Sequence, residues 1–249
     1  MAQSRELVPA PPSRPDYPPV PWRWWEALVV FLIGSVAGAI LIAPVAAGIH
    51  GHRLQDATAA MVAEAAIGAT AFLWLFGMYR RALPALGFPS RIALELAAGF
   101  VGGLVVYGVG VFVIGTALAA LIQAVSSESV HAPRQIPHPD TAVQIGIEAL
   151  TVIVIAPFSE ELLFRGMLFR SLRARMAFPV AAGISAVAFG AVHWVPGAQW
   201  QNATLLVSVM CSVGFGLAYL YERRGTIVAP MAAHATFNVI GFVAIVLLR

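Results

Sequence analysis

The sequence predicts an all-α fold, a bundle of about seven membrane-spanning helices, or eight if one long apolar stretch is broken. The 249 residues are 59% hydrophobic and only 11% charged, whereas soluble domains have about 25% charged residues. The mean hydropathy is +0.82. Several apolar runs reach the roughly 20 residues that a helix needs to cross a bilayer. Composition and run length therefore both indicate a polytopic membrane protein.

Residues 1–22 form a Pro-rich tail that contains seven prolines. Such a segment does not form a regular helix, and we predict a disordered cytoplasmic tail; a proline-rich partner motif is the other interpretation. Residues 23–249 are then predicted to be a single transmembrane domain. Trp24, Trp25 and Arg23 at its start have the aromatic and basic character of a membrane interface.

The apolar segments of this domain are separated by short polar or Pro-containing loops. They predict spans at about 25–49, 57–79, 92–125, 142–175, 179–194, 203–221 and 226–248. The third is longer than one crossing of the bilayer. We expect one long helix there, although Gly99, Gly102 and Gly103 allow a break and hence an eighth segment.

The basic residues predict the orientation, and all 15 of them are Arg. Counted on alternate sides of seven spans, twelve lie on the side of the N-terminus and three on the other. Because basic residues are enriched in cytoplasmic loops, we predict a multi-pass protein of the cytoplasmic (inner) membrane with its N-terminus in the cytoplasm. These loop arginines also explain the pI of about 9.5, so we expect no nucleic-acid partner.

The stretch from Ala156 to Gly166 interrupts an apolar run with two glutamates and an arginine. Ionisable groups at membrane depth cost roughly 2.5–3.5 kcal/mol each, so they are usually paired or functional. Glu161 and Arg165 share a helical face and we expect them to pair; an ion-paired helix end at the interface is the alternative. Glu160 points elsewhere, and a carboxyl group in apolar surroundings can serve as a general base.

Two later spans carry polar residues at the same four-residue spacing. Phe189 precedes His193 on the fifth span, and His234 precedes Asn238 on the seventh. A single His inside a membrane is more often a packed, hydrogen-bonded residue than a catalyst. Two of them, together with an Asn and a Glu, indicate a reaction centre if they converge.

The chain length between these residues predicts that they do converge. The fourth and fifth spans form a hairpin that turns near Met176, and Glu160 and His193 lie 16 and 17 residues from that turn. At 1.5 Å per residue, both are about 25 Å from it. His234 and Asn238 can reach the same depth from the turn between the sixth and seventh spans. We therefore expect these four residues to form one cluster inside the membrane.

The ordered pattern Glu-Glu-x-x-x-Arg, Phe-x-x-x-His and His-x-x-x-Asn, each on a separate span, resembles the CAAX protease and bacteriocin-processing family of intramembrane proteases. Its best-known members are the type II CAAX prenyl endopeptidases. The resemblance covers residues 142–245 and implies hydrolysis of peptide bonds in a membrane-associated protein or peptide. The roles that it implies are water activation by Glu160 and His193, and oxyanion stabilisation by His234 and Asn238. Glu161 and Arg165 would support Glu160 and the local helix geometry, and Phe189 would pack beside the site.

The resemblance leaves the role of a metal open, because the family has been described both as metalloproteases and as metal-independent glutamate proteases. Two histidines and a carboxylate can bind zinc, and the ligands would be Glu160, His193 and His234. The chain has no His-Glu-x-x-His motif. We expect no obligatory cofactor.

A non-catalytic membrane protein, either a scaffold of the same fold or a transporter-like protein, is the alternative class. Transporters also place Glu, His and Arg inside the membrane. The Glu-Glu-x-x-x-Arg spacing combined with the later His motifs argues against a transporter but is compatible with a scaffold. In every case the lipid bilayer is an expected partner, and for the enzyme so is a membrane-embedded or membrane-associated substrate.

Overall fold

A computed structural model describes residues 20–126, 128–133, 135–136 and 138–247, and all regular elements in these residues are helical. Most of the predicted Pro-rich tail, residues 1–19, lies outside the described residues. The elements are α1 (Trp24–Ala47), α2 (His52–Tyr79), η1 (Arg80–Leu86), α3 (Ile92–Tyr107), η2 (Gly108–Gly115), α4 (Thr116–Ser126), α5 (Ala142–Leu150), η3 (Thr151–Ile155), α6 (Ala156–Glu160), η4 (Glu161–Phe169), α7 (Arg170–Arg173), α8 (Phe178–Val192), α9 (Trp200–Arg224) and α10 (Val228–Leu247).

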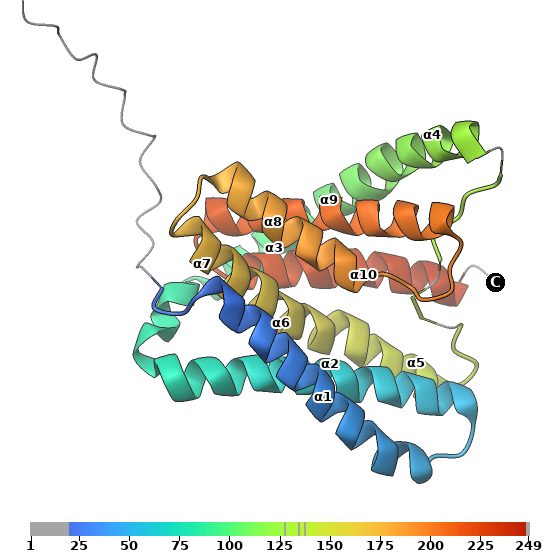
Figure 1. The fold of residues 1–249 in the computed structure, drawn as a ribbon, viewed down its shortest axis with the longest axis horizontal. Coiled ribbons are helices and arrows are strands. Elements are labelled where there is room, and N and C mark those ends of the chain that lie inside the picture. The colour runs from blue at the N-terminus through green and yellow to red at the C-terminus, as the bar shows by residue number, and fades with distance from the viewer. Residues whose placement is uncertain (1–19, 127, 134, 137, 248–249) are drawn as a thin grey trace, which may run out of the picture.

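These elements join into seven apolar segments that run back and forth through one bundle (Figure 1). Within the described residues, six of them are long and apolar enough to cross a membrane. Their limits are 24–47, 52–86, 92–126, 142–173, 200–224 and 228–247, close to those predicted from the sequence. The predicted polytopic helical bundle is therefore confirmed.

The fifth segment is shorter than predicted. Its helix, α8, has 15 residues and ends at Val192, so it is about 22 Å long against a hydrocarbon core of about 30 Å. His193 is the C-terminal cap of this helix rather than part of it. Because the helix ends early, His193 lies partway along the length of the bundle.

The third segment is one continuous helical stretch from Ile92 to Ser126, as we expected, with π-helical turns between Gly108 and Gly115. Gly99 and Gly103 serve packing and do not cause a break. A Cβ atom at Gly99 or Gly103 would lie 2.5 Å from a carbonyl oxygen of α10, that of Ala229 or Ala233 respectively. Small residues let membrane helices approach closely, and here they let α3 pack on α10.

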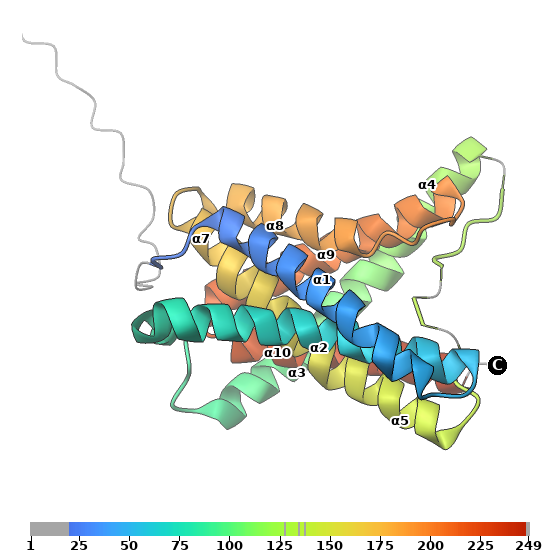
Figure 2. The same cartoon turned by 60° about the horizontal axis from the view of Figure 1, so that its bottom comes forward.

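The segment that carries the charged stretch, residues 142–173, occupies the middle of the bundle (Figures 1 and 2). Its elements contact α1, α2, α8 and α10, while the outer helices pair as α1 with α2, α3 with α10, and α8 with α9. Charged groups on this segment are consequently enclosed by protein rather than by lipid. That enclosure is the usual condition for ionisable side chains at membrane depth.

One arginine in the orientation count does not report orientation. Arg165 is one of the twelve arginines counted on the side of the N-terminus, but its side chain is fully buried in the bundle. Without it the arginine asymmetry in the sequence is eleven to three.

The start of α1, the α7–α8 turn and the α9–α10 turn lie at one end of the bundle, and the α1–α2 turn and the α4–α5 connection lie at the other (Figures 1 and 2).

Candidate active site

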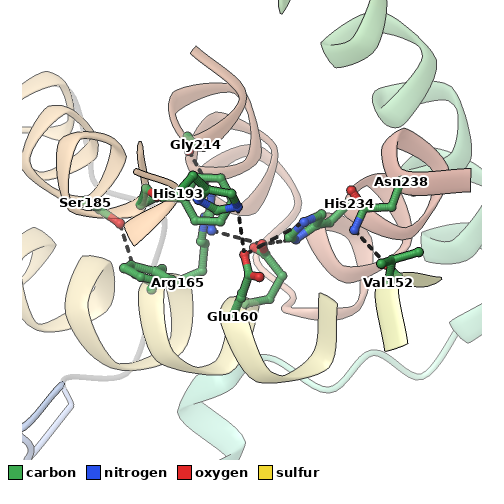
Figure 3. Close-up of polar contacts among 11 residues, drawn as sticks. Val152, Glu160, Arg165, Ser185, His193, Gly214, His234 and Asn238 are labelled. Carbon is green, nitrogen blue, oxygen red and sulfur yellow. Dashed lines mark hydrogen bonds and ion pairs between the residues drawn. The ribbon is translucent and has the colours of Figure 1, made fainter. Parts of the chain in front are cut away.

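Pro157 shapes the backbone just before the two glutamates. The preceding turn, η3, is π-helical, a geometry in which an N–H bonds the carbonyl five residues earlier. Proline has no N–H, so the carbonyl of Val152 lacks that donor. The Asn238 side chain supplies one instead, because its Nδ2 donates to this oxygen at 2.6 Å (Figure 3). Helix α10 is thereby attached to the start of the charged stretch.

The segment that begins at Glu161, η4, is also π-helical, and side chains from elsewhere bond its carbonyl groups. The Ser185 hydroxyl of α8 donates to the Phe164 carbonyl at 3.0 Å. The indole Nε1 of Trp22 donates to the Gly166 carbonyl at 3.2 Å. Neither donor was among the predicted site residues. Ser185 could have been found from the sequence, because it is the single hydroxyl-bearing residue in an otherwise apolar helix.

The predicted pair of Glu161 and Arg165 is present and fully buried, with 2.9 Å between Oε1 and Nη1. The guanidinium makes two further contacts. Its Nη2 donates to the Gly214 carbonyl of α9 at 3.1 Å, and its Cζ lies 4.4 Å from the centre of the Phe189 ring. A buried ion pair needs such additional partners to offset the loss of hydration. The pair thus joins the central segment to α8 and α9.

Glu161 also holds one of the two histidines. Its Oε1 lies 2.9 Å from Nδ1 of His234, and a carboxylate oxygen accepts the proton of an imidazole N–H. This contact fixes the ring so that the other nitrogen, Nε2, faces Glu160. Glu161 therefore supports His234 directly, whereas the motif resemblance implied that it supports Glu160.

Glu160 stands between the two histidines (Figure 3). Its Oε2 is 3.9 Å from Nε2 of His193 and 3.9 Å from Nε2 of His234. These distances are too long for direct hydrogen bonds, but they suit a water molecule that bridges the groups. The Oε2 atom is buried and has no hydrogen-bond partner within the described part of the chain. The convergence expected from the hairpin count is thus seen in the structure.

The orientation of His193 is set by Phe189. The Nδ1 atom lies 2.7 Å from the Phe189 carbonyl oxygen, which can only accept a hydrogen bond, so Nδ1 carries the proton. In the neutral ring, Nε2 is then an acceptor that faces Glu160. The Phe189 ring also packs against both histidines, with centroid distances of 4.7 Å to His193 and 5.7 Å to His234.

A cavity of about 450 Å³ opens beside this cluster, and Glu160, His193, His234 and Asn238 all line it. The volume is within the range of ligand-binding sites. The remaining wall comes from α2, η3, α6, α9, α10 and four residues of the α4–α5 connection, which are Ala132, Pro133, Gln135 and Ile136. Two of these lining residues, Glu64 and Gln135, were not among the predicted site residues.

Glu160 lies farther from the two possible histidine ligands than a tetrahedral zinc site requires. Tetrahedral zinc with ligands at about 2.1 Å would hold neighbouring ligand atoms about 3.4 Å apart, whereas Glu160 Oε2 lies 3.9 Å from each imidazole Nε2. Within the described residues, no group of three or more His, Cys, Asp or Glu side chains is placed to hold a metal ion.

The fold and this cluster together define a polytopic helical membrane protein with a Glu-His centre in its core. Residues 142–240 match the family described as Type II CAAX prenyl endopeptidase Rce1-like. The match covers all three motifs and confirms the resemblance to CAAX proteases. At the level of the family it supports a membrane peptidase.

Three curated proteins are similar to this chain. An Uncharacterized 24.3 kDa protein of Escherichia coli is 28% identical over 68% of this chain and 73% of its own length. The "Putative membrane peptidase YdiL" of Bacillus subtilis is 35% identical over 34% of this chain and 32% of its own length. The UPF0177 protein YxdF of Lactococcus lactis is 34% identical over 38% of this chain and 48% of its own length. No solved structure is significantly similar to the chain.

Proposed function

We propose that this protein is an intramembrane endopeptidase that hydrolyses a peptide bond of a membrane-associated protein or peptide. The observation that carries the proposal is the position of Glu160, whose buried Oε2 lies 3.9 Å from Nε2 of both His193 and His234 at the wall of the large cavity. A carboxylate and two imidazoles around a space for water suit acid–base hydrolysis. The family match supports the same class of reaction.

In the proposed mechanism, Glu160 is the general base. A water molecule hydrogen-bonds to its Oε2 and to the acceptor nitrogen Nε2 of His193. Glu160 removes one proton from this water as the oxygen attacks the carbonyl carbon of the scissile bond. The C–N bond then breaks while the leaving nitrogen takes up a proton. The contact between His193 Nδ1 and the Phe189 carbonyl keeps Nε2 turned toward the water.

His234 and Asn238 are the proposed donors to the oxyanion. His234 donates through Nε2 in its doubly protonated form, while its Nδ1–H is held by the Glu161 carboxylate. Asn238 uses one N–H for the Val152 carbonyl and has a second N–H for the cavity that it lines. Arg165 neutralises Glu161 and keeps it in place. Donors aimed at the developing negative charge lower the barrier to reaction.

We further propose that the reaction needs no bound metal, which the distances from Glu160 to the two histidines support. The test uses purified protein in proteoliposomes with a panel of internally quenched single-span peptides. Cleavage by the wild type is expected to be unchanged by a zinc chelator. Loss of cleavage that zinc restores would overturn the metal-independent mechanism. If the wild type cleaves no peptide in the panel, the alternative of a non-catalytic membrane scaffold is favoured instead.

The arginine asymmetry supports a cytoplasmic N-terminus in the inner membrane, and seven crossings then place the C-terminus on the opposite face. A phosphatase reporter fused to the C-terminus is expected to be active, because this enzyme matures only outside the cytoplasm. A fluorescent reporter that folds only in the cytoplasm serves as the matched fusion and should stay dark. The reverse pair of signals would contradict the proposed orientation.

A further inference from the structure

Glu64 of α2 is an acidic side chain that faces the same cavity as Glu160. It lies outside residues 142–240, the part of the chain that matches the family. Its Oε2 atom is buried and has no hydrogen-bond partner in the described residues. Burial of a carboxyl oxygen without a hydrogen-bond partner reduces the stability of the folded protein. The position of Glu64 at this cavity therefore needs a functional explanation.

A second cavity, of about 260 Å³, adjoins the first. The two cavities share four lining residues, Glu64, Gln135, Glu160 and His193, and all four are polar. The rest of the smaller cavity is mainly apolar, with Phe31, Ile67 and residues of η4 and α8. We call this shared wall the polar junction; a peptide bound across both cavities would pass the carboxyl groups of Glu64 and Glu160.

The two carboxyl groups come from different helices whose backbones are held together. The Ser159 hydroxyl, next to Glu160 in the chain, donates to the Glu64 backbone carbonyl at 2.9 Å. Gly68, one turn further along α2, packs directly on Ser159 and leaves no room for a Cβ atom. This contact fixes α2 against α6, so Glu64 and Glu160 keep a constant relation across the junction.

Glu64 and Glu160 form an acidic pair at the junction. Glu64 and Glu160 each line both cavities, from α2 and α6 respectively. Among the described residues that line the two cavities there is no arginine, and the nearby Arg165 is bonded to Glu161. Where two carboxyl groups face one reaction site, one can act as the acid while it is protonated and the other as the base while it is ionised.

We propose that Glu64 is the general acid of the reaction and that Glu160 is its general base; this inference rests on the proposed endopeptidase function. Glu160 takes a proton from water as the C–O bond forms. Protonated Glu64 gives its proton to the leaving nitrogen as the C–N bond breaks. The products are a carboxylic acid and an amine. Transfer of the proton from Glu160 to Glu64 then restores the starting state, with one water consumed.

The leaving group provides the test of this role. The probes are an internally quenched single-span peptide cleaved by the wild type and its thioester counterpart at the scissile bond. An amine leaves only after protonation, whereas a thiol has a pKa near 8.5 and leaves as the thiolate. Glu64→Gln is expected to lower kcat for the amide about 100-fold, with KM unchanged, and to cleave the thioester at the wild-type rate. Glu160→Gln should be impaired on both.

The matched control is Glu148→Gln. Glu148 is another buried carboxyl group with an unpartnered Oε2 in the described residues, but it lines neither cavity. This variant is expected to cleave both probes at the wild-type rate. The inference is overturned if Glu64→Gln impairs both probes equally, which indicates a structural role, or impairs neither. Failure of the proposed function has a different signature, because then the wild type cleaves neither probe.

A second measurement does not depend on cleavage. The infrared spectrum of the wild type at neutral pH is expected to contain the carbonyl stretch of a protonated carboxylic acid. Glu64→Gln should remove part of that band, provided that the variant elutes and unfolds like the wild type. An unchanged band in the folded variant would show that Glu64 holds no proton and would overturn the assignment.

Discussion

Replacing Glu160 with Gln is expected to lower kcat for peptide cleavage about 1,000-fold, the middle of the range for loss of a general base. Glutamine has the same shape but cannot accept a proton from water. KM should change little, because the amide still occupies the space between His193 and His234. Initial rates with an internally quenched single-span peptide in proteoliposomes provide the measurement.

Two further variants sharpen this prediction. Glu160→Asp keeps the base but withdraws it by one methylene, and a displacement of about 1 Å is expected to cost roughly 100-fold in rate. Glu148→Gln removes a buried carboxyl group outside both cavities and should leave the rate unchanged. Wild-type cleavage by Glu160→Gln would remove Glu160 from the reaction.

Replacing Arg165 with Met is expected to destabilise the protein by about 3–5 kcal/mol, the cost of leaving one partner of a buried ion pair alone. Methionine fills much of the volume of the side chain, so the loss arises mainly from the unpaired Glu161 and from the Gly214 carbonyl, which loses its donor. The free energy of unfolding in bicelles, measured by steric trapping, is the appropriate readout.

The matched control for Arg165→Met is Arg53→Met. Arg53 pairs with Asp140, and both side chains are more than half exposed. Loss of such an exposed pair is expected to cost at most about 1 kcal/mol. Equal effects of the two substitutions would contradict the structural role given to the buried pair. The double variant Glu161→Gln/Arg165→Met should recover part of the stability, because no uncompensated charge remains.

Several features of the fold could be predicted because they depend on local patterns or chain length. Apolar runs set the limits of the spans, and four-residue spacing predicted the pairing of Glu161 with Arg165. Equal chain lengths from the hairpin turn brought Glu160 and His193 to the same depth. Each of these inferences needs only the rise of a helix and the position of a turn.

Other features depend on contacts between helices that no local pattern encodes. Carbonyl groups in the π-helical turns of η3 and η4 accept hydrogen bonds from Asn238, Ser185 and Trp22, which lie in distant parts of the chain. The contact of Glu161 with His234 likewise joins residues 73 positions apart. Glu64 reaches the cavity only through the rotation of α2 that the packing of Gly68 on Ser159 fixes. The rotation of a helix about its own axis depends on its packing against all neighbouring helices, so the local sequence does not predict it.

The central claim is that Glu160 activates a water molecule that attacks the substrate directly. Single-turnover cleavage in water labelled with the heavy oxygen isotope tests it, with mass spectrometry of the product and of the protein. If Glu160 is a general base, the new carboxyl terminus of the product carries one heavy oxygen and the Glu160 side chain carries none. Heavy oxygen in the Glu160 carboxyl group, with an unlabelled product, would show covalent attack by Glu160 and contradict the claim.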